Sequence, residues 1–406
     1  MKTIIILGDG MADYPIEALE GKTPLMVARK PGMDWIARQG RTGLFRTVEA
    51  DLPPGSEVAN MTVLGYNPRT DLNGRGVLEA ASMGVHLEPD ELASRVNLVS
   101  VVDGKMKSHS CGHISNEEAH ELIAYLQEKF SGWGFRLIPG LSYRHLLVLP
   151  GGDARIACSP PHDHLDTPIT ELMVKAVAEE ARPVAELLNR MILESNVFLE
   201  NHPINIARRQ NGHLPANYLW PWSPGKKPLM KTFQEKYGVR GAVISAVDLI
   251  KGIGTYAGMT VLSVDGATGL YDTNYEGKAD AALKALEDHD LVYVHVEAPD
   301  EAGHERNLSL KIKCIEDLDV RLVQRILKGI AGKEQETVIA LLPDHATPVC
   351  HGAHTRDPIP VAILDPRQTP DSVQCFDEVS VQQGSLGLFS GPQFIETVLG
   401  IAGAHT

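Results

Sequence analysis

Three apolar stretches of this sequence, each typical of a buried strand, are followed by acidic or histidine residues. These residues are Asp9 after KTIIILG, Asp300 and His304 after DLVYVHV, and Asp344, His345 and His354 after TVIALL. A charged group at the end of a buried strand is costly unless it has a partner. Since the carboxyl ends of strands in an open α/β sheet meet at one edge, we expect these side chains to converge.

Carboxylate oxygens and imidazole nitrogens together suit divalent cations such as Mn²⁺ or Zn²⁺. The set offers more ligands than one ion needs, which favours two neighbouring ions, a device that stabilises phosphoryl transfer. Taken singly, each Asp after a strand could be a helix cap and each His an ordinary polar group. The repetition of the same residue types at three strand ends favours the metal interpretation.

A serine stands where such ions could act on it. Ser56 follows Pro-Pro-Gly at a predicted helix start, in the N-cap position. A helix N-terminus offers free N–H groups to an anion, so a phosphoserine formed there would be held. The alternative is that Ser56 only caps the helix.

The elements that must position these residues alternate between strand and helix from about residue 238 onward, which predicts a doubly wound α/β sheet. The first strand joins this sheet, so the middle of the chain is an insertion. We place the discontinuous core domain at 1–85 and 232–406 and the inserted α/β domain at 86–231. Within the insertion we expect a helix over 116–130, a mostly helical 168–202 interrupted near Pro183, and a Pro-, Gly- and Trp-rich crossing segment over 208–228.

The composition limits the partners and the compartment. A net charge of −14 argues against nonspecific binding to nucleic acid or to an anionic membrane. Five scattered cysteines without a CxxC pair fit a reducing compartment, and neither a signal peptide nor a run of about 18 apolar residues is present. We therefore expect a cytoplasmic protein.

The motifs GDGMAD, PPGSEVANMTVLGY, NGRGVLEAASMG, HVEAPDEAGH, LPDHATPV and HTRDPIP, in this order, resemble those of the archaeal-type cofactor-independent phosphoglycerate mutases. The resemblance covers nearly the whole chain. That family belongs to the alkaline phosphatase superfamily. The resemblance implies a phosphatase-like metal-binding core with an inserted substrate-binding domain, and Ser56 as the nucleophile. It also implies two divalent ions (Mn, or Zn or Mg), divided between Asp300, His304 and His354 on one side and Asp9, Ser56, Asp344 and His345 on the other.

Five further residues are candidates for substrate binding. Lys251 resembles the family's phosphate-binding lysine, and Arg75 lies in a Gly-flanked loop from which it could reach a phosphate. His162 and Asp163 belong to a PPHD stretch that recurs in the family, although this loop could also be a solvated turn. His113 lies in KSHSCGHIS, where the mutases usually carry arginines.

These departures, together with Asn60 where the mutases usually have histidine, resemble a bacterial subgroup proposed to be homoserine kinases. The first functional hypothesis is therefore interconversion of 2- and 3-phosphoglycerate through a phosphoserine, with hinge motion near residues 85 and 232. The alternative is transfer from ATP to homoserine, and the third hypothesis is a phosphatase. In each case the partner is a small phosphorylated or hydroxyl-bearing metabolite. The sequence leaves open the metal, the acceptor and the oligomeric state.

Overall fold

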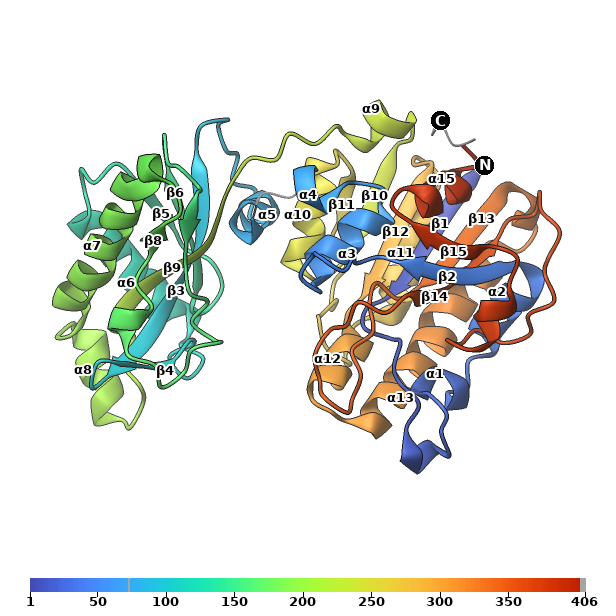
Figure 1. Ribbon diagram of the computed structural model, residues 1–406, viewed down its shortest axis with the longest axis horizontal. Coiled ribbons are helices and arrows are strands. Elements are labelled where there is room, and N and C mark those ends of the chain that lie inside the picture. The colour runs from blue at the N-terminus through green and yellow to red at the C-terminus, as the bar shows by residue number, and fades with distance from the viewer. Residues whose placement is uncertain (72–73, 402–406) are drawn as a thin grey trace. The chain divides into compact units, whose positions relative to one another are not determined.

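The computed structural model describes residues 1–71 and 74–401, and the chain divides into two compact units (Figure 1). Unit 1 consists of residues 1–72 and 230–406, and unit 2 of residues 73–229. The first boundary thus falls before helix α5 (Arg75–Ser82), not at the predicted residue 85. The reason is packing, because α5 lies against strands β3 (Leu92–Val102) and β9 (Tyr218–Lys226) of unit 2.

Unit 1 is built on an eight-stranded sheet in the order β11-β10-β12-β1-β13-β14-β2-β15. The first five strands are parallel, and β14 runs antiparallel to both of its neighbours. The strands are β1 Lys2–Gly8, β2 Arg41–Arg46, β10 Gly241–Ile244, β11 Thr260–Leu262, β12 Leu291–Val296, β13 Thr337–Leu342, β14 Ile359–Leu364 and β15 Gly387–Ser390. Their Val-, Ile- and Leu-rich sequences suit strands that are buried on both faces.

Helices cover both faces of this sheet, which confirms the predicted doubly wound α/β core. One face packs Ile4 and Ile6 against α2, α11, α13 and α14. On β2, Leu44 packs against that cluster while its neighbour Phe45 stacks on Phe394 of α15, with ring centroids 5.2 Å apart, so α15 covers the other face. The helices of unit 1 are α1 Pro24–Val27, α2 Pro31–Gln39, α3 Ser56–Val63, α4 Pro68–Asp71, α9 Phe233–Tyr237, α10 Asp248–Tyr256, α11 Tyr275–Ala285, α12 Ala298–His304, α13 Leu308–Asp317, α14 Gln324–Gly329 and α15 Gln393–Leu399.

Unit 2 is an antiparallel sheet with its own core. The long strand β3 pairs with β4, β6 and β9, and β5 extends the sheet beside β6. Helices α6 and α7 bury their apolar residues against it. The remaining elements are β4 Lys105–Ser108, α6 Asn116–Lys129, β5 Arg136–Ile138, β6 Arg144–Leu149, β7 Ile156–Ala157, β8 Lys175–Ala176, α7 Arg182–Leu199 and α8 Pro203–Gln210.

Two expectations for this unit were wrong. Residues 168–181 form short 3-10 helices and strand β8 rather than a continuous α-helix, because Pro183 lies in the first turn of α7 and starts that helix instead of interrupting a longer one. The Pro-, Gly- and Trp-rich segment contains β9, which pairs with β3 along most of its length. The predicted helix over 116–130 is confirmed within one residue.

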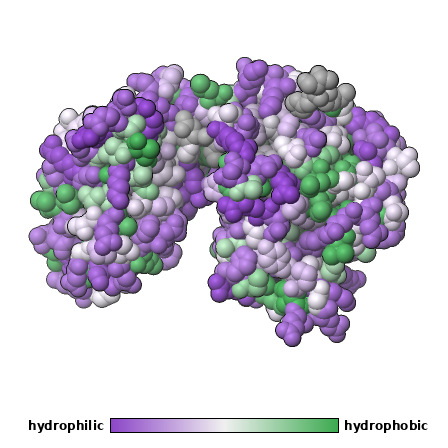
Figure 2. All heavy atoms as spheres, viewed as in Figure 1, coloured by the Kyte–Doolittle hydropathy of each residue, from purple (hydrophilic) through white to green (hydrophobic). Residues whose placement is uncertain are grey.

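Among residues 1–71 and 74–401, none of the helices combines the length and the apolar character needed to cross a bilayer. On the face shown in Figure 2, hydrophobic residues form small scattered groups within a hydrophilic surface. The apolar side chains are instead collected in the two cores.

Candidate active site

Three adjacent strands bring the predicted residues to one edge of the sheet. β1 lies between β12 and β13, and Ile6 is paired in register with Val294 on one side and with Leu341 on the other. The three strands are parallel, so the segments that follow them leave the sheet side by side. Asp9 follows β1, Asp344 follows β13, and Asp300 lies in α12, directly after β12.

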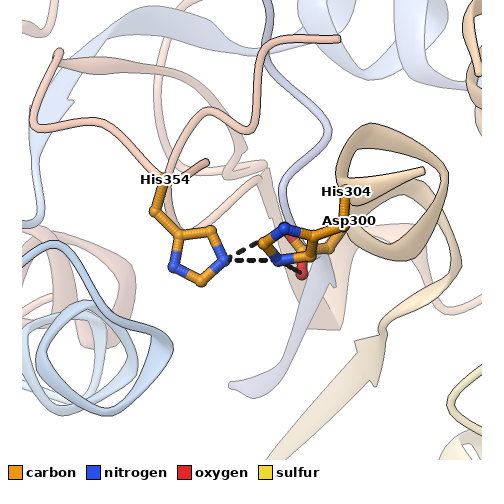
Figure 3. Close-up of side chains that lie close together, drawn as sticks. All are labelled: Asp300, His304 and His354. Carbon is orange, nitrogen blue, oxygen red and sulfur yellow. Dashed lines mark hydrogen bonds and ion pairs between the residues drawn. The ribbon is translucent and has the colours of Figure 1, made fainter. Parts of the chain in front are cut away.

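The first group of ligand-type side chains is Asp300, His304 and His354 (Figure 3). Asp300 and His304 lie one turn apart on α12, with 3.0 Å between Oδ2 and Nε2. His354 comes from the loop after β13 and places its Nε2 3.5 Å from Asp300 Oδ1 and 2.9 Å from His304 Nε2. The carboxylate is almost completely buried, and the imidazoles approach it from two different segments.

Hydrogen bonds at the far side of each ring define which nitrogen faces the group. His304 Nδ1 is 2.9 Å from the carbonyl of Gly352, and His354 Nδ1 is 3.2 Å from that of Pro54. A carbonyl only accepts, so each Nδ1 carries a hydrogen, and in the neutral rings the two Nε2 lone pairs point at one another. A cation between the two nitrogens would remove the repulsion between their lone pairs. Hydrogen bonds from Nδ1 to backbone carbonyls commonly orient metal-binding histidines.

Without a cation, protons must take its place. The hydrogen bond to Asp300 raises the pKa of His304 to about 9. Burial lowers the pKa of His354, but the hydrogen bond to Asp300 and its charge outweigh burial, and the net shift is upward. The group therefore attracts positive charge, either as a bound cation or as protons on the two histidines.

The second group is Asp9, Asp344 and His345, all fully buried, with Ser56 beside them. His345 Nε2 lies 3.6 Å from Asp9 Oδ1, 3.4 Å from Asp344 Oδ2 and 3.1 Å from the hydroxyl of Ser56. Asp9 Oδ1 is buried and has no hydrogen-bond partner among the described residues. Burial and the charge of Asp344 raise the pKa of Asp9, so the group also lacks positive charge.

Thr347 joins the two groups and determines the tautomer of His345. Its hydroxyl donates to Asp300 Oδ1, so its oxygen accepts the hydrogen of His345 Nδ1 at 3.2 Å. His345 Nε2 is then an unprotonated nitrogen that faces the two carboxylates and Ser56. A buried, unpartnered carboxylate oxygen beside such a nitrogen fits a divalent cation, which the donor set of both groups suits.

Ser56 is the first residue of α3, and Gly55, in extended conformation, is its N-cap. This corrects the predicted N-cap position of Ser56. The N-cap residue Gly55 provides no side-chain cap, and the hydroxyl of Ser56 faces His345. The N–H groups of the first turn, which have no acceptor within the helix itself, lie close to the hydroxyl.

Two buried supports fix the loops that carry the site. Gly10 has φ +58°, and a Cβ there would lie 2.7 Å from the Cα of Asp300, so only glycine fits. Lys311 of α13 donates to the carbonyls of Ala12 (3.1 Å) and Thr347 (2.8 Å) and pairs with Asp13 at 2.8 Å. It therefore ties the loop after β1 to the loop after β13.

His295 and Glu297 form a third cluster with Asp9. His295 Nε2 lies 2.9 Å from Asp9 Oδ2, and its Nδ1 lies 3.2 Å from the Ser245 hydroxyl. Burial lowers the pKa of His295 to about 3, so the ring is neutral and its Nε2–H donates to Asp9. Burial raises the pKa of Glu297 to about 8. The sequence showed these residues beside the motif but gave them no role.

Unit 2 contains a separate basic cavity of about 200 Å³. Its lining residues are Arg75, Arg95, Asn97, His109, Tyr143, Arg144, His162 and Trp222. On β3, Val96 and Leu98 point into the core, so Arg95 and Asn97 point to the opposite face.

Arg95 is the most buried cation of this cavity. It lies over the ring of Trp222 at 4.2 Å, pairs with Glu79 at 2.9 Å, and has a buried Nε without a hydrogen-bond partner among the described residues. Burial lowers the pKa of Arg95 to about 10, and the charges of Arg75 and Arg144 contribute to this shift. Three guanidinium groups around one small cavity favour an anionic ligand.

The other predicted substrate residues lie in different places. His162 lines the cavity, whereas Asp163 is exposed and pairs with His162 at 3.6 Å. His113 is exposed and contacts Tyr143 edge-on, with centroids 6.2 Å apart. Lys251 lies in α10 of unit 1, 3.5 Å from Asp248. Sequence reasoning missed Arg95 and Arg144; an arginine inside the apolar stretch LASRVNLVS was the available signal for Arg95.

The strand ends place carboxylates and imidazoles beside a serine at the start of a helix. This arrangement suits enzymes that transfer phosphoryl groups with divalent cations. The family model for 2,3-bisphosphoglycerate-independent phosphoglycerate mutase matches residues 37–205. A protein of this name from Methanosarcina acetivorans is 50% identical over 97% of this chain and 98% of its own. A probable mutase of the same name from Geobacter sulfurreducens is 47% identical over 98% of this chain and 100% of its own.

Solved structures agree in fold. The PH0037 protein from Pyrococcus horikoshii has a TM-score of 0.85 at 29% identity, covering 100% of this chain and 99% of its own. The cofactor-independent phosphoglycerate mutase from Thermoplasma acidophilum has a TM-score of 0.70 at 28% identity, covering 99% of this chain and 100% of its own. The chain belongs to the 2,3-bisphosphoglycerate-independent phosphoglycerate mutase family. The homoserine kinase alternative finds no support in these relatives.

Proposed function

We propose that this protein interconverts 2-phosphoglycerate and 3-phosphoglycerate, without a bisphosphoglycerate cofactor, through a phosphoserine at Ser56. The observation that carries the proposal is the position of the Ser56 hydroxyl, 3.1 Å from His345 Nε2 in the buried Asp9–Asp344–His345 group. The close relationship to proteins named as this mutase supports the choice of substrate.

The residues present fit two divalent cations, with Mn²⁺ as our first choice and Zn²⁺ or Mg²⁺ as alternatives. Asp300, His304 and His354 would hold one ion, and Asp9, Asp344, His345 and Ser56 the other. When bound, the ions would lower the pKa of the Ser56 hydroxyl and neutralise charge on the phosphoryl oxygens.

The chain's own groups would then carry the transfer. Ser56 Oγ loses its proton and attacks phosphorus, the bond from phosphorus to the C3 oxygen breaks, and that oxygen takes up a proton to give glycerate. The N–H groups of the first turn of α3 hold the phosphoserine. In the second half, the C2 hydroxyl loses its proton and attacks phosphorus, the bond from phosphorus to Ser56 Oγ breaks, and Oγ takes up a proton. The reverse sequence gives 3-phosphoglycerate.

The basic cavity of unit 2 supports the same substrate, since its guanidinium groups suit the carboxylate of glycerate. Arg75 and His162, proposed from the sequence, line this cavity together with Arg95 and Arg144. Lys251, Asp163 and His113 remain proposals for contacts with phosphate or glycerate. The five cysteines are all free thiols, which supports the expected cytoplasmic location.

The test uses the purified protein with Mn²⁺ in two assays, one with 3-phosphoglycerate alone and one with ATP and homoserine. The products of both are identified by ³¹P NMR. We expect 2-phosphoglycerate in the first assay and no product in the second. Ser56→Ala should abolish the conversion, whereas Ser131→Ala, at an exposed serine of unit 2, should not change it.

The other outcomes assign the alternatives. Phosphohomoserine only in the second assay would replace the mutase with the kinase. Release of inorganic phosphate without 2-phosphoglycerate would indicate a phosphatase.

A further inference from the structure

Asn60 lies one turn after Ser56 on α3, is fully buried, and uses its whole side-chain amide. Its Nδ2 donates to the Ser56 carbonyl at 2.8 Å and to Asp344 Oδ2 at 2.9 Å. Its Oδ1 accepts the hydroxyl hydrogen of Tyr293, a fully buried residue of β12. One amide therefore joins the nucleophile's own turn, a site carboxylate and the central sheet.

The chemistry of these partners leaves one orientation for the amide. The Ser56 carbonyl and the Asp344 carboxylate can only accept, so both must face the NH₂ group. Oδ1 then faces Tyr293, whose hydroxyl donates to it. A flipped amide would place Oδ1 against two acceptors in a buried position, which is costly.

Asn60 also completes the support of Asp344. Asp344 Oδ1 accepts from the N–H groups of Gly10 (3.2 Å) and His345 (2.9 Å), while Oδ2 is held by Asn60. Both oxygens are thus oriented, and Oδ2, which among the described residues accepts only from Asn60, retains a lone pair. Since Asn60 also holds the carbonyl of Ser56, it sets the distance between the start of α3 and the carboxylate.

We propose that Asn60 is a positioning residue that aligns Ser56 with Asp344, and that Tyr293 holds it in the working orientation. This inference rests on the proposed function for its kinetic consequence, but its consequence for cation binding does not depend on which substrate is used. Outer partners of metal ligands typically contribute about 10- to 100-fold to metal affinity or activity.

The experiment compares Asn60→Asp, Asn60→Ala and Tyr293→Phe with the unchanged protein. Asn60→Asp keeps the shape of the side chain but turns two donors into acceptors facing Asp344. We expect it to weaken Mn²⁺ binding, which is measured by titration with EPR detection. We also expect it to lower kcat by about 100-fold with an unchanged KM for 3-phosphoglycerate. Asn60→Ala should lower Mn²⁺ affinity and kcat by about 10- to 100-fold each, and Tyr293→Phe should lower each by about 10-fold.

Thr62→Ala is the matched control. Thr62 lies on the same helix and, like Asn60, bonds the carbonyl four residues earlier, here Val58 at 2.9 Å, but it does not touch the site. It should change neither Mn²⁺ affinity nor kcat, even if it lowers the melting temperature. A role for Asn60 in folding alone would make its variants behave like Thr62→Ala.

The proposal is overturned if Asn60→Asp and Tyr293→Phe, folded at the assay temperature, bind Mn²⁺ with the affinity of the unchanged protein. If the unchanged protein does not convert 3-phosphoglycerate, the proposed function fails while the Mn²⁺ titrations still decide the role of Asn60. If Asn60→Ala does not fold, the isosteric Asn60→Asp and the Tyr293→Phe variant, which keeps Asn60 itself, provide the decision.

Discussion

The Nε2 atoms of His304 and His354 face each other at 2.9 Å, although each ring donates its Nδ1 hydrogen to a backbone carbonyl. Two neutral rings in this arrangement place lone pair against lone pair. The pair is stable only with a positive charge between the rings, supplied by a cation or by protons. This competition leads to the first prediction.

Cation affinity should rise with pH. Asp300 raises the pKa of His304 from 6.5 to about 9, so below pH 9 a cation must displace a proton. We expect Mn²⁺ affinity to increase about tenfold per pH unit for each proton displaced between pH 7 and 9. In the cation-free protein the sign is opposite. The ion pair of protonated His304 with Asp300 contributes stability that is fully present below about pH 6.5 and is lost as the pH rises through about 9.

Titrations with Mn²⁺ at pH 7, 8 and 9, together with melting curves in EDTA, measure both effects. His304→Asn should remove the pH dependence of the stability in EDTA and weaken binding at every pH. A Mn²⁺ affinity that stays constant across this range would contradict the prediction.

Gly10→Ala should damage the site beyond the cost of its backbone conformation. A residue other than glycine at φ +58° costs about 1–2 kcal/mol, and the added Cβ would also press against Asp300. We expect a larger loss of the free energy of unfolding, measured in urea, and a loss of Mn²⁺ binding. Gly21→Ala is the control, because Gly21 has φ +78° and open space around its Cβ. Equal effects of the two substitutions would argue against the close approach.

Lys311→Met should destabilise the protein by about 3–5 kcal/mol, since it leaves the carboxylate of Asp13 buried without its cation. The loops after β1 and β13 also lose their common donor. Lys313→Met, two residues along the same helix, removes a pair with Asp317 in which the lysine is mostly exposed, and should cost less than about 1 kcal/mol. Urea denaturation of both variants measures the loss in the free energy of unfolding. A similar midpoint for the two would show that the buried Lys311–Asp13 pair is not needed for stability.

Arg144→Gln should raise the KM for 3-phosphoglycerate by about 10- to 100-fold, because charge-assisted hydrogen bonds contribute about 1.5–3 kcal/mol. Mn²⁺ affinity should not change, since Arg144 lies in the cavity of unit 2. Arg136→Gln serves as control: it lies on the neighbouring strand, is mostly exposed and pairs with Glu91. A kinetic assay in which both variants keep the original KM would exclude the cavity as the glycerate site.

Much of the site follows from the sequence because it depends on strand ends. Buried parallel strands are recognised in a sequence as apolar runs, and the residues that follow them lie at one edge of the sheet. Asp9, Asp300 and Asp344 could therefore be grouped without coordinates. The contact between Ser56 and His345 could not be predicted in the same way, because it depends on the packing of α3, which no local pattern encodes.

Other features depend on long-range pairing and could not be read locally. Strand β9 was missed because its Pro and Gly residues are typical of loops, yet its pairing with β3 makes it a strand. The first domain boundary was misplaced because α5 has the same apolar pattern whichever core it covers. Arg95 and Arg144 meet in one cavity only because β3 and β6 are paired.

The order of the sheet has a consequence for synthesis on the ribosome. Strand β1 is among the first segments made, but its neighbours β12 and β13 begin at residues 291 and 337. The sheet of unit 2, by contrast, is complete once residue 226 has emerged. The inserted unit can therefore fold while the apolar β1 still waits for its partners, and the catalytic centre is assembled last, when the chain is nearly finished.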